Sequence, residues 1–170
     1  MTNTNYKTIA SKIKFEGRAF INGKYVDAID GKKFETINPA TGETLCSVAK
    51  CNSKDVDLAV KVSRKAFNSG VWSRTSPEFR KDILLKFAEL LRVHGVENSV
   101  LECIDTGKLI GDCINEVAND APMHFQWYGE LIDKVFGKVG PTEPSLTSLI
   151  VKEPIGIVAG VVPWNFPLMM

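Results

Sequence analysis

Apolar residues recur at every third or fourth position through the middle of the chain, which is the spacing of amphipathic helices. The first such pattern follows Ser53, a good N-cap residue, and stops at Gly70, a residue type that commonly ends helices. The second begins with Ser76 as N-cap and Pro77 in the first turn, where the missing N–H costs nothing. The spacing predicts helices from Ser53 to Gly70, from Ser76 to Gly95, and from about Val96 to Asp105.

A longer helical pattern extends from about Ile114 to Phe136 and contains Pro122. Proline removes a backbone donor and clashes with the preceding turn, so an uninterrupted helix is not expected there. We expect either a kink near Ala118 or a helix that restarts at Asn119 or Asp120.

The segments before and after these helices contain the turn residues of β-hairpins. Asn22-Gly23 and Asp30-Gly31 supply the positive φ angles of tight turns, so residues 20–39 are predicted to form a two- or three-stranded antiparallel unit. Residues 43–51 are predicted to form another strand. Residues 134–154 contain several glycines and prolines between short apolar stretches, which favours a polar hairpin.

The longest apolar run, IGIVAGVV at residues 155–162, has the length of a strand, whereas a membrane span needs about 20 residues. We predict a buried parallel strand here, because the run is apolar throughout. Such a strand requires neighbouring strands and helices on both faces, and no such elements follow it in these 170 residues. We therefore expect the chain to be the opening part of a larger protein.

Composition narrows the possible functions. Twenty-one Lys and Arg against 20 Asp and Glu give a net charge of +1, so the chain has no basic field that would attract nucleic acid. Four cysteines without a CxxC pair suit buried thiols in a reducing compartment rather than a zinc site. The lysine-bearing residues 1–20 suggest either a mitochondrial targeting peptide or a short helix on the mature protein, and the expected location is cytoplasmic.

Candidate chemistry is sparse when the residues are taken alone. Glu102 and Asp105 form a carboxylate pair three residues apart, for which a solvated helix end is the favoured interpretation. Glu116 and Asp120, four apart on one helical face, form either a rim that binds a cation or a simply solvated pair. Cys103 lies beside a carboxylate, which raises the pKa of a thiol, so we interpret this cysteine as structural.

The turn PWNFP at residues 163–167 stands apart from these candidates. Its two prolines hold the chain rigid around Asn165, whose uncharged side-chain amide carries two N–H donors. A rigid neutral donor at the end of a buried strand suits oxyanion stabilisation, at the edge where open α/β sheets bind ligands. The competing interpretation is that Asn165 caps a following helix, and the residues alone do not separate the two.

Five segments together carry a family resemblance: FINGKYVDA, FETINPATGETL, LECIDTGK, WYGELIDKVFGKV and KEPIGIVAGVVPWNFPL. From about Phe20 to Met170 the chain resembles the N-terminal third of the NAD(P)-dependent aldehyde dehydrogenase superfamily, in particular its enzymes for aminoaldehydes such as γ-glutamyl-γ-aminobutyraldehyde or betaine aldehyde. The resemblance implies an α/β fold in which residues 1–133 are the outer part of an incomplete, Rossmann-like coenzyme domain. Residues 134–154 would form an oligomerisation hairpin, and residues 155–170 the first strand of the sheet and the start of the next helix.

The resemblance also implies roles for single residues. Asn165 would be the oxyanion-hole asparagine, acting together with the backbone N–H of the catalytic cysteine. Phe166 and Met169 would wall the aldehyde tunnel, with the carboxylates of Glu116 and Asp120 at its mouth. The nicotinamide and ribose side of the cofactor cleft would be lined by Asn165 and the four residues before it, which are Val161, Val162, Pro163 and Trp164.

The same resemblance implies NAD or NADP as cofactor, an aldehyde substrate, a homo-oligomer, and a structural Na⁺ or K⁺ held by the Asp105 carboxylate and the Ile37 backbone carbonyl. The family's nucleophilic cysteine, general-base glutamate and Gly-Ser-Thr cofactor loop match nothing in these residues, so the 170-residue chain is predicted to be inactive alone. Two alternatives stay open. The chain could be a non-catalytic regulatory protein that joins full-length subunits through residues 134–154, or a structural protein of enzyme descent.

Overall fold

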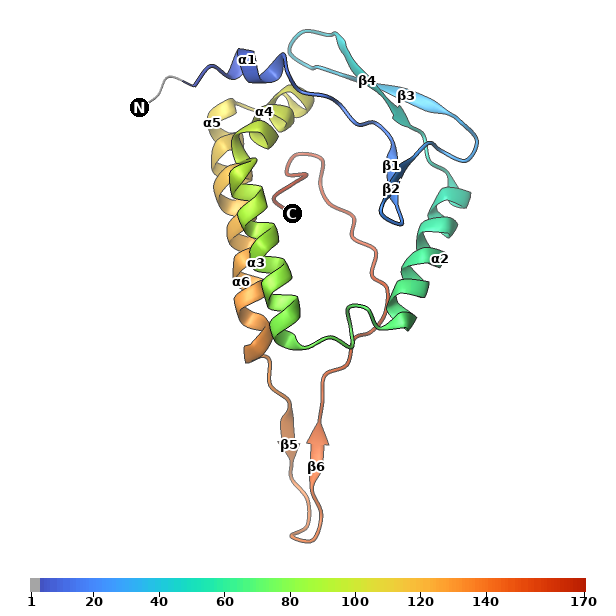
Figure 1. Ribbon diagram of the computed structural model, residues 1–170, viewed down its shortest axis with the longest axis vertical. Helices are drawn as coiled ribbons and strands as arrows, with labels where there is room; N and C mark the ends of the chain where they lie inside the picture. Colours follow the sequence, from blue (N-terminus) through green and yellow to red (C-terminus); the bar gives the residue numbers. More distant parts are fainter. Residues whose placement is uncertain (1–3) are drawn as a thin grey trace.

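A computed structural model describes residues 4–170, and Figure 1 shows how its helices and hairpins are arranged. The helices are α1 (Tyr6–Ala10), α2 (Ser53–Ser69), α3 (Pro77–Val93), α4 (Gly95–Thr106), α5 (Ile110–Cys113), the π-helix η1 (Ile114–Asp120), α6 (Ala121–Leu131) and the 3₁₀ helix η2 (Ile132–Lys134). The strands are β1 (Ala19–Ile21), β2 (Lys24–Val26), β3 (Lys33–Ile37), β4 (Thr44–Ala49), β5 (Lys138–Gly140) and β6 (Ser148–Ile150).

The N-terminal segment contains the short helix that was one of its two predicted forms. This helix, α1, packs beside α4, and Asn5 caps it by accepting a hydrogen bond from the Thr8 N–H at 3.1 Å. Residues 1–3, which belong to the candidate targeting peptide, lie outside the described residues. Among residues 4–170, no helix has both the length and the apolar character that crossing a bilayer requires.

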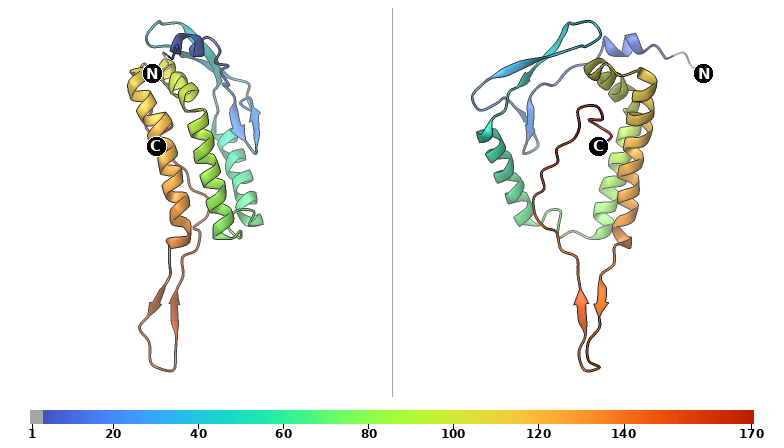
Figure 2. Two further views of the ribbon diagram at one scale, coloured as in Figure 1. Left: turned by 60° about the vertical axis from the view of Figure 1, so that its left-hand side comes forward. Right: turned by 180° about the vertical axis from the view of Figure 1, so that it is seen from behind.

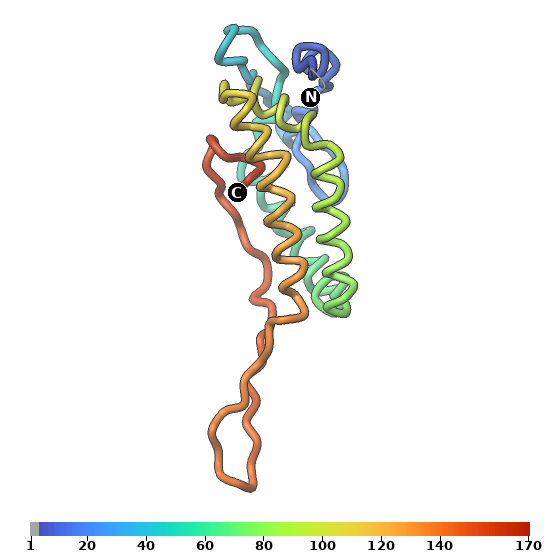
Figure 3. Tube along the Cα trace, turned by 90° about the vertical axis from the view of Figure 1, so that its left-hand side faces the viewer, coloured from blue at the N-terminus to red at the C-terminus, as the bar shows by residue number. Residues whose placement is uncertain are grey.

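The long helices α3 and α6 lie side by side and form the body of the molecule (Figures 1 and 3). The rings of Phe87 on α3 and Phe125 on α6 meet edge to face with their centroids 4.7 Å apart, an arrangement that aromatic pairs favour. The buried apolar side chains gather where this pair meets α4, α5 and η1, and include Ala88, Leu91, Val100, Cys113, Val117 and Ala121.

Two predicted helix boundaries are confirmed by their capping contacts. Ser76 accepts a hydrogen bond from the Phe79 N–H at 3.1 Å, and Pro77 is the first residue of α3. Gly70 ends α2 with a left-handed φ of 76°, a conformation that glycine adopts without strain.

Two other boundaries differ from the prediction. The N-cap of α2 is Asn52 and not Ser53. Asn52 and Asp55 form a capping box, in which the side chain of each residue accepts a hydrogen bond from the backbone N–H of the other. Gly95 does not end α3 but begins α4, where a Cβ at this position would lie 2.7 Å from the Cβ of Ala118. A residue without a Cβ therefore allows α4 and η1 to approach closely.

The predicted irregularity near Pro122 is confirmed, and it has the form of a π-helix. The Ala121 N–H donates to the carbonyl of Glu116, five residues back, at the end of η1. Pro122 lacks an N–H, so a regular α-helix would lose a bond here, and the wider π turn accommodates that loss without a break before α6.

The strands form three separate antiparallel pairs within the described residues: β1–β2, β3–β4 and β5–β6. The turn between β1 and β2 is Asn22-Gly23, and both residues have positive φ as predicted. Of the two predicted forms over residues 20–39, the two-stranded one is confirmed by β1 and β2, whereas β3 pairs with β4, the strand predicted at residues 43–51. The β3–β4 ladder is irregular between Thr36 and Ile37.

Residues 134–154 contain the predicted hairpin, whose strands β5 and β6 project away from the helices (Figures 1 and 2). Val139 and Leu149 pair across it and expose 73% and 66% of their surface. Exposed apolar strands with free edges are suited to pairing with another chain. The role of this hairpin in oligomerisation stays a prediction.

The predicted buried parallel strand at residues 155–162 is wrong for this chain. The segment has no regular secondary structure, and Ile155 and Val161 expose 93% and 98% of their surface. A strand is held by ladder hydrogen bonds to a neighbour, and none of the described strands lies beside this segment. The expected start of the next helix is limited to a turn, in which the Met170 N–H donates to the Phe166 carbonyl at 3.2 Å.

Candidate active site

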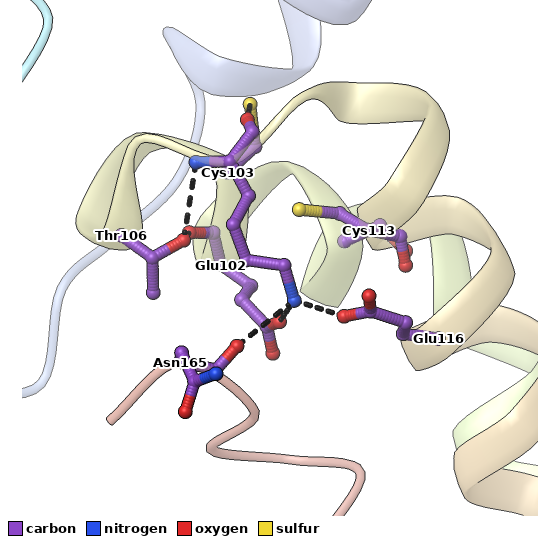
Figure 4. Close-up of polar contacts among 8 residues, drawn as sticks. Glu102, Cys103, Thr106, Cys113, Glu116 and Asn165 are labelled. Carbon is purple, nitrogen blue, oxygen red and sulfur yellow. Dashed lines mark hydrogen bonds and ion pairs between the residues drawn. The ribbon is translucent and has the colours of Figure 1, made fainter. Parts of the chain in front are cut away.

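The PWNFP turn lies against the loop that follows α4. Inside the turn, the Phe166 N–H donates to the Pro163 carbonyl at 3.3 Å, so the bend is closed by its own backbone. Figure 4 shows Asn165 facing the carboxylates of Glu102, from α4, and Glu116, from η1. The final coil therefore meets two helical segments at the residue that the sequence singled out.

Lys108 joins these three groups, and sequence reasoning did not identify it. Its ammonium group donates to Oε1 of Glu102 at 2.9 Å, to Oε2 of Glu116, and to the backbone carbonyl of Asn165 at 3.1 Å. It also lies 4.6 Å from the centroid of the Phe166 ring, within the range of a cation–π contact. The residue follows Gly107, which ends α4 with φ 78° and turns the chain.

The charge on Lys108 is stabilised by its neighbours despite burial. Desolvation by itself would lower the pKa of this ammonium group, but hydrogen bonds and Coulomb attraction from Glu116 and Glu102 outweigh it, so the pKa lies above its ordinary value. The lysine is therefore a fixed cation at neutral pH. Its side chain is only 18% exposed, which limits the screening of these contacts by water.

Glu102 corrects an expectation, because it is not a solvated residue at a helix end. Only 6% of its surface is exposed, and its second oxygen, Oε2, is buried without a hydrogen-bond partner among the described residues. A lone buried carboxylate is costly, and the ion pair with Lys108 offsets that cost. Periodicity places Glu102 on a helix but cannot show that a lysine six residues later folds back onto it.

The two carboxylates predicted for the tunnel mouth have different surroundings. Glu116 is paired with Lys108, and its side chain is 18% exposed. Asp120 is half-buried at the end of η1, and its backbone carbonyl lies 2.9 Å from Nδ1 of His124. Glu116 therefore belongs to the group of residues bound to Lys108, whereas Asp120 lies four residues further along η1, next to the start of α6.

The predicted tunnel residues Phe166 and Met169 lie on two sides of the turn. Phe166 packs under the Lys108 ammonium, whereas Met169 lines a cavity of about 520 Å³ together with aromatic side chains of α6. The other residues around this cavity are Leu84, His124, Phe125, Tyr128, Leu168 and Met170. The cavity is mostly apolar and opens beside the turn that carries Asn165.

The residues predicted to contact the cofactor form an open, extended stretch. Val161 and Trp164 expose 98% and 78% of their surface, and Val162 exposes 49%. Pro163 is also exposed. Apolar side chains and free backbone groups on one stretch are suitable for one wall of a cleft around a planar ring.

One of the predicted cation ligands, Asp105, contacts the residue that precedes the other in the chain. Asp105, at the end of α4, accepts a hydrogen bond through Oδ1 from the Thr36 hydroxyl at 2.9 Å, and Thr36 directly precedes Ile37 in β3. A carboxylate, a hydroxyl and backbone carbonyls are hard oxygen donors, which Na⁺ and K⁺ prefer. The donor set therefore fits the ion that the resemblance implies.

The prediction of four buried thiols is wrong, because only Cys113 is buried and Cys51 is exposed. Burial raises the pKa of the Cys113 thiol to about 11, so this group stays protonated at neutral pH. The Cys103 thiol donates to the Lys108 carbonyl at 3.1 Å and so helps to fix the loop after α4. These contacts support the structural interpretation of Cys103.

The fold and this site together define the class of protein. Residues 25–170 match the family described as "Aldehyde dehydrogenase family", so the chain belongs to that family. The match covers the PWNFP turn, Lys108 and both carboxylates of the cluster. The fold is the N-terminal part of the aldehyde dehydrogenase fold.

Curated relatives of this chain are named as aldehyde dehydrogenases. The chain is 41% identical over its whole length to the aminoacetaldehyde dehydrogenase of Pseudomonas aeruginosa, and covers 34% of that protein. It is 41% identical over 161 residues to the NADP/NAD-dependent aldehyde dehydrogenase PuuC of Escherichia coli, covering 95% of this chain and 32% of that one. The chain thus spans about a third of the length of these curated relatives.

Solved structures show the same fold. The indole-3-acetaldehyde dehydrogenase AldA of P. syringae, in complex with NAD⁺, superposes with a TM-score of 0.94 at 42% identity, over 97% of this chain and 33% of that one. The γ-glutamyl-γ-aminobutyraldehyde dehydrogenase of Burkholderia cenocepacia gives a TM-score of 0.93 at 43% identity, over 96% of this chain and 33% of that one.

Proposed function

We propose that this chain is the N-terminal part of an oxidoreductase that oxidises an aldehyde, specifically an aminoaldehyde, to the carboxylic acid with NAD or NADP. The observation that carries the proposal is the rigid turn around Asn165, whose backbone carbonyl accepts a hydrogen bond from Lys108 (Figure 4), while its side-chain amide makes no hydrogen bond to any residue from 4 to 170. An amide donor that is held in place but unused can bind a developing negative oxygen.

The proposed reaction converts an aldehyde, water and the oxidised cofactor into a carboxylic acid, the reduced cofactor and a proton. When bound, the nicotinamide supplies the hydride acceptor. Asn165 would donate its amide N–H to the oxygen of the tetrahedral adduct that forms when a thiolate attacks the aldehyde carbon. The thiolate, the general base and the other oxyanion donor match nothing in residues 1–170, so we propose that this chain is inactive alone.

The proposal of an aminoaldehyde substrate is supported by Asp120, whose backbone carbonyl lies 2.9 Å from Nδ1 of His124, a residue that lines the cavity. Glu116 is already paired with Lys108, so we assign the substrate amine to Asp120, with Glu116 adding to the negative potential. Phe166 and Met169 would contact the apolar part of the substrate. Relatives named for aminoacetaldehyde and γ-glutamyl-γ-aminobutyraldehyde agree with this class of substrate.

The cofactor and cation are part of the same proposal. The exposed stretch from Val161 to Trp164, with Asn165, would form the nicotinamide side of the cleft, and a relative solved with NAD⁺ supports this choice of cofactor. Asp105 and the Ile37 carbonyl would hold a structural Na⁺ or K⁺, a proposal supported by the hydrogen bond between Asp105 and Thr36, the residue before Ile37.

Assembly and location complete the proposal. The projecting hairpin of β5 and β6 would join subunits of a homo-oligomer by strand pairing, since its apolar residues are exposed. The four free thiols suit a reducing compartment, so we propose a cytoplasmic location. The same hairpin supports the alternative function, in which the chain joins full-length subunits without catalysis.

The test is Asn165→Ala in the full-length enzyme, assayed with an aminoaldehyde. Loss of one oxyanion donor is expected to lower kcat by about 100- to 1,000-fold. Cofactor affinity, measured by fluorescence titration, is expected to stay within about twofold, because the amide acts in the transition state. Asn68→Ala, at an exposed position on α2, is the matched control and is expected to leave kcat unchanged. An unchanged kcat in Asn165→Ala would remove the residue from this role.

A further inference from the structure

The ammonium group of Lys108 uses all of its N–H donors in hydrogen bonds. A lysine ammonium group has three N–H donors, and here they go to Glu102, Glu116 and the carbonyl of Asn165. Three bonds in different directions fix the position of the nitrogen. The long, flexible side chain of Lys108 is thereby held in one position, where it connects α4, η1 and the PWNFP turn.

The backbone of Lys108 is fixed as well. The Lys108 N–H donates to the Thr106 hydroxyl at 3.4 Å, and the Lys108 carbonyl accepts from the Cys103 thiol at 3.1 Å. Thr106 in turn donates its hydroxyl to the Glu102 carbonyl at 2.6 Å, inside the last turn of α4. The lysine backbone is therefore tied to the same helix that supplies one of its carboxylate partners.

The hydrogen bond from Lys108 links the PWNFP turn to the helical part of the molecule. The turn's other hydrogen bonds within the described residues are internal ones, from Phe166 to Pro163 and from Met170 to Phe166. The Lys108 ammonium group binds the carbonyl of Asn165 and lies over the ring of the next residue, Phe166. One cation therefore holds both the proposed oxyanion donor and a proposed wall of the aldehyde tunnel.

We propose that Lys108 is a positioning residue, which acts through the backbone of Asn165 to aim the side-chain amide at the reacting oxygen. Glu102 and Glu116 hold the lysine in place and neutralise it. This inference rests on the proposed function, in which Asn165 is the oxyanion donor. Lys108 itself touches neither substrate nor cofactor in this proposal, so its effect is expected on the rate of the chemical step.

The test is a double-mutant cycle in the full-length enzyme with Lys108→Met and Asn165→Ala. Lys108→Met is expected to lower kcat by about 10- to 100-fold, since a misplacement of about 1 Å can cost 100-fold, with KM within about threefold. In the Asn165→Ala background, the same substitution is expected to cause no further loss, because the donor that it positions is gone. Lys108→Arg is expected to restore part of the rate, since a guanidinium group keeps the charge with different geometry.

A matched control and a second variant separate positioning from folding. Lys81→Met removes another ion-paired lysine, which binds Asp133 at 2.7 Å and makes no hydrogen bond to the PWNFP turn, and is expected to leave kcat unchanged. Lys108→Met leaves Glu102 buried and unpaired, which can prevent folding. Should that variant not fold by circular dichroism, the pair Lys108→Met with Glu102→Gln removes the buried charge and takes its place in the cycle.

Each combination of kcat values in the single and double variants either supports or overturns the proposal. A loss that disappears in the Asn165→Ala background supports the positioning role. A loss of equal size in both backgrounds overturns it, because Lys108 then acts elsewhere, and so does an unchanged kcat in Lys108→Met. If Asn165→Ala alone leaves kcat unchanged, the proposed function fails first, and the positioning of a catalytic donor fails with it.

Discussion

Asp55 is expected to be the key residue at the junction between the N-terminal hairpins and α2. Its carboxylate is 3% exposed and accepts from the Ile29 N–H through Oδ1 and from the Asn52 N–H through Oδ2, each at 2.8 Å. The first bond joins the loop after β2 to the helix, and the second closes the capping box. Asp55→Ala would leave both donors without their acceptor.

The size of the effect follows from these two bonds. A hydrogen bond to a charged group contributes about 1.5–3 kcal/mol, so two of them set an upper value of about 6 kcal/mol. Ile29 is 54% exposed, which allows water to reach its N–H once the carboxylate is removed. We therefore expect the lower value, about 3 kcal/mol, which corresponds to roughly a 150-fold larger opening constant at the junction.

Amide hydrogen exchange measured by mass spectrometry reads this local opening directly. Peptides that cover residues 27–31 and 50–56 are expected to exchange roughly 150-fold faster in Asp55→Ala, under conditions where reclosing is faster than the intrinsic exchange of the open amides. Asp57→Ala is the matched control, since this residue has the same side chain in the same turn but is exposed. Equal exchange in the two variants would refute the reasoning, because the buried bonds would then contribute nothing.

Two further predictions concern the helices. Gly95→Ala is expected to destabilise the protein by about 1–3 kcal/mol, because its Cβ would lie 2.7 Å from that of Ala118. In thermal unfolding, the control Gly111→Ala, which meets no atom within 4 Å, should keep the parent melting temperature. Hydrogen bonds from Lys134 and a second lysine lower the pKa of Asp133 to about 2. The stability from this depressed pKa is complete above about pH 4 and is lost as the pH falls toward 2. In NMR titrations, Lys134→Met should move the carboxyl pKa upward; an unmoved value would contradict this.

The helical part of the fold could be predicted because its signals are local. Ser76, Pro77 and Gly70 act through bonds that span at most four residues, so the sequence contains the whole cause of each boundary. Pro122 likewise predicts a disturbed helix from its own chemistry. Whether the result is a kink or a π-helix depends on how η1 packs against α4 and α6, which a local pattern does not contain.

An apolar stripe shows which face of a helix favours burial but not what covers it. Val56 and Val60 follow helical spacing on α2, yet they expose 58% and 50% of their surface, because no helix packs on that face among the described residues. The same reasoning fails at residues 155–162. Their apolar character was interpreted as a buried strand, but a strand forms only when a neighbour supplies the ladder bonds.

The candidate site was predictable only where its residues act through their own chemistry. Asn165 could be identified because prolines and an amide lie together in five residues of sequence. Lys108 could not, since its role arises from partners on α4, η1 and the final turn, the last of them 57 residues away. The only signal in the sequence was that Lys108 stands between two glutamates, six residues after Glu102 and eight before Glu116. Charged residues at such intervals are common on solvated helices, so the pattern alone does not identify a cluster.

The contacts that fix the turn and the surfaces left exposed are separate in this molecule. Glu102, Glu116 and the backbone carbonyl of Asn165 all bind Lys108 within the described residues. Large exposed apolar surfaces on α2, on the β5–β6 hairpin and along residues 155–162 take no part in these hydrogen bonds. Contacts that cover those surfaces would therefore stabilise the protein without having to create the geometry at Asn165. If Lys108 positions the donor, this part of the oxyanion site is built from within the chain, and its defects should appear in kcat before they appear in assembly.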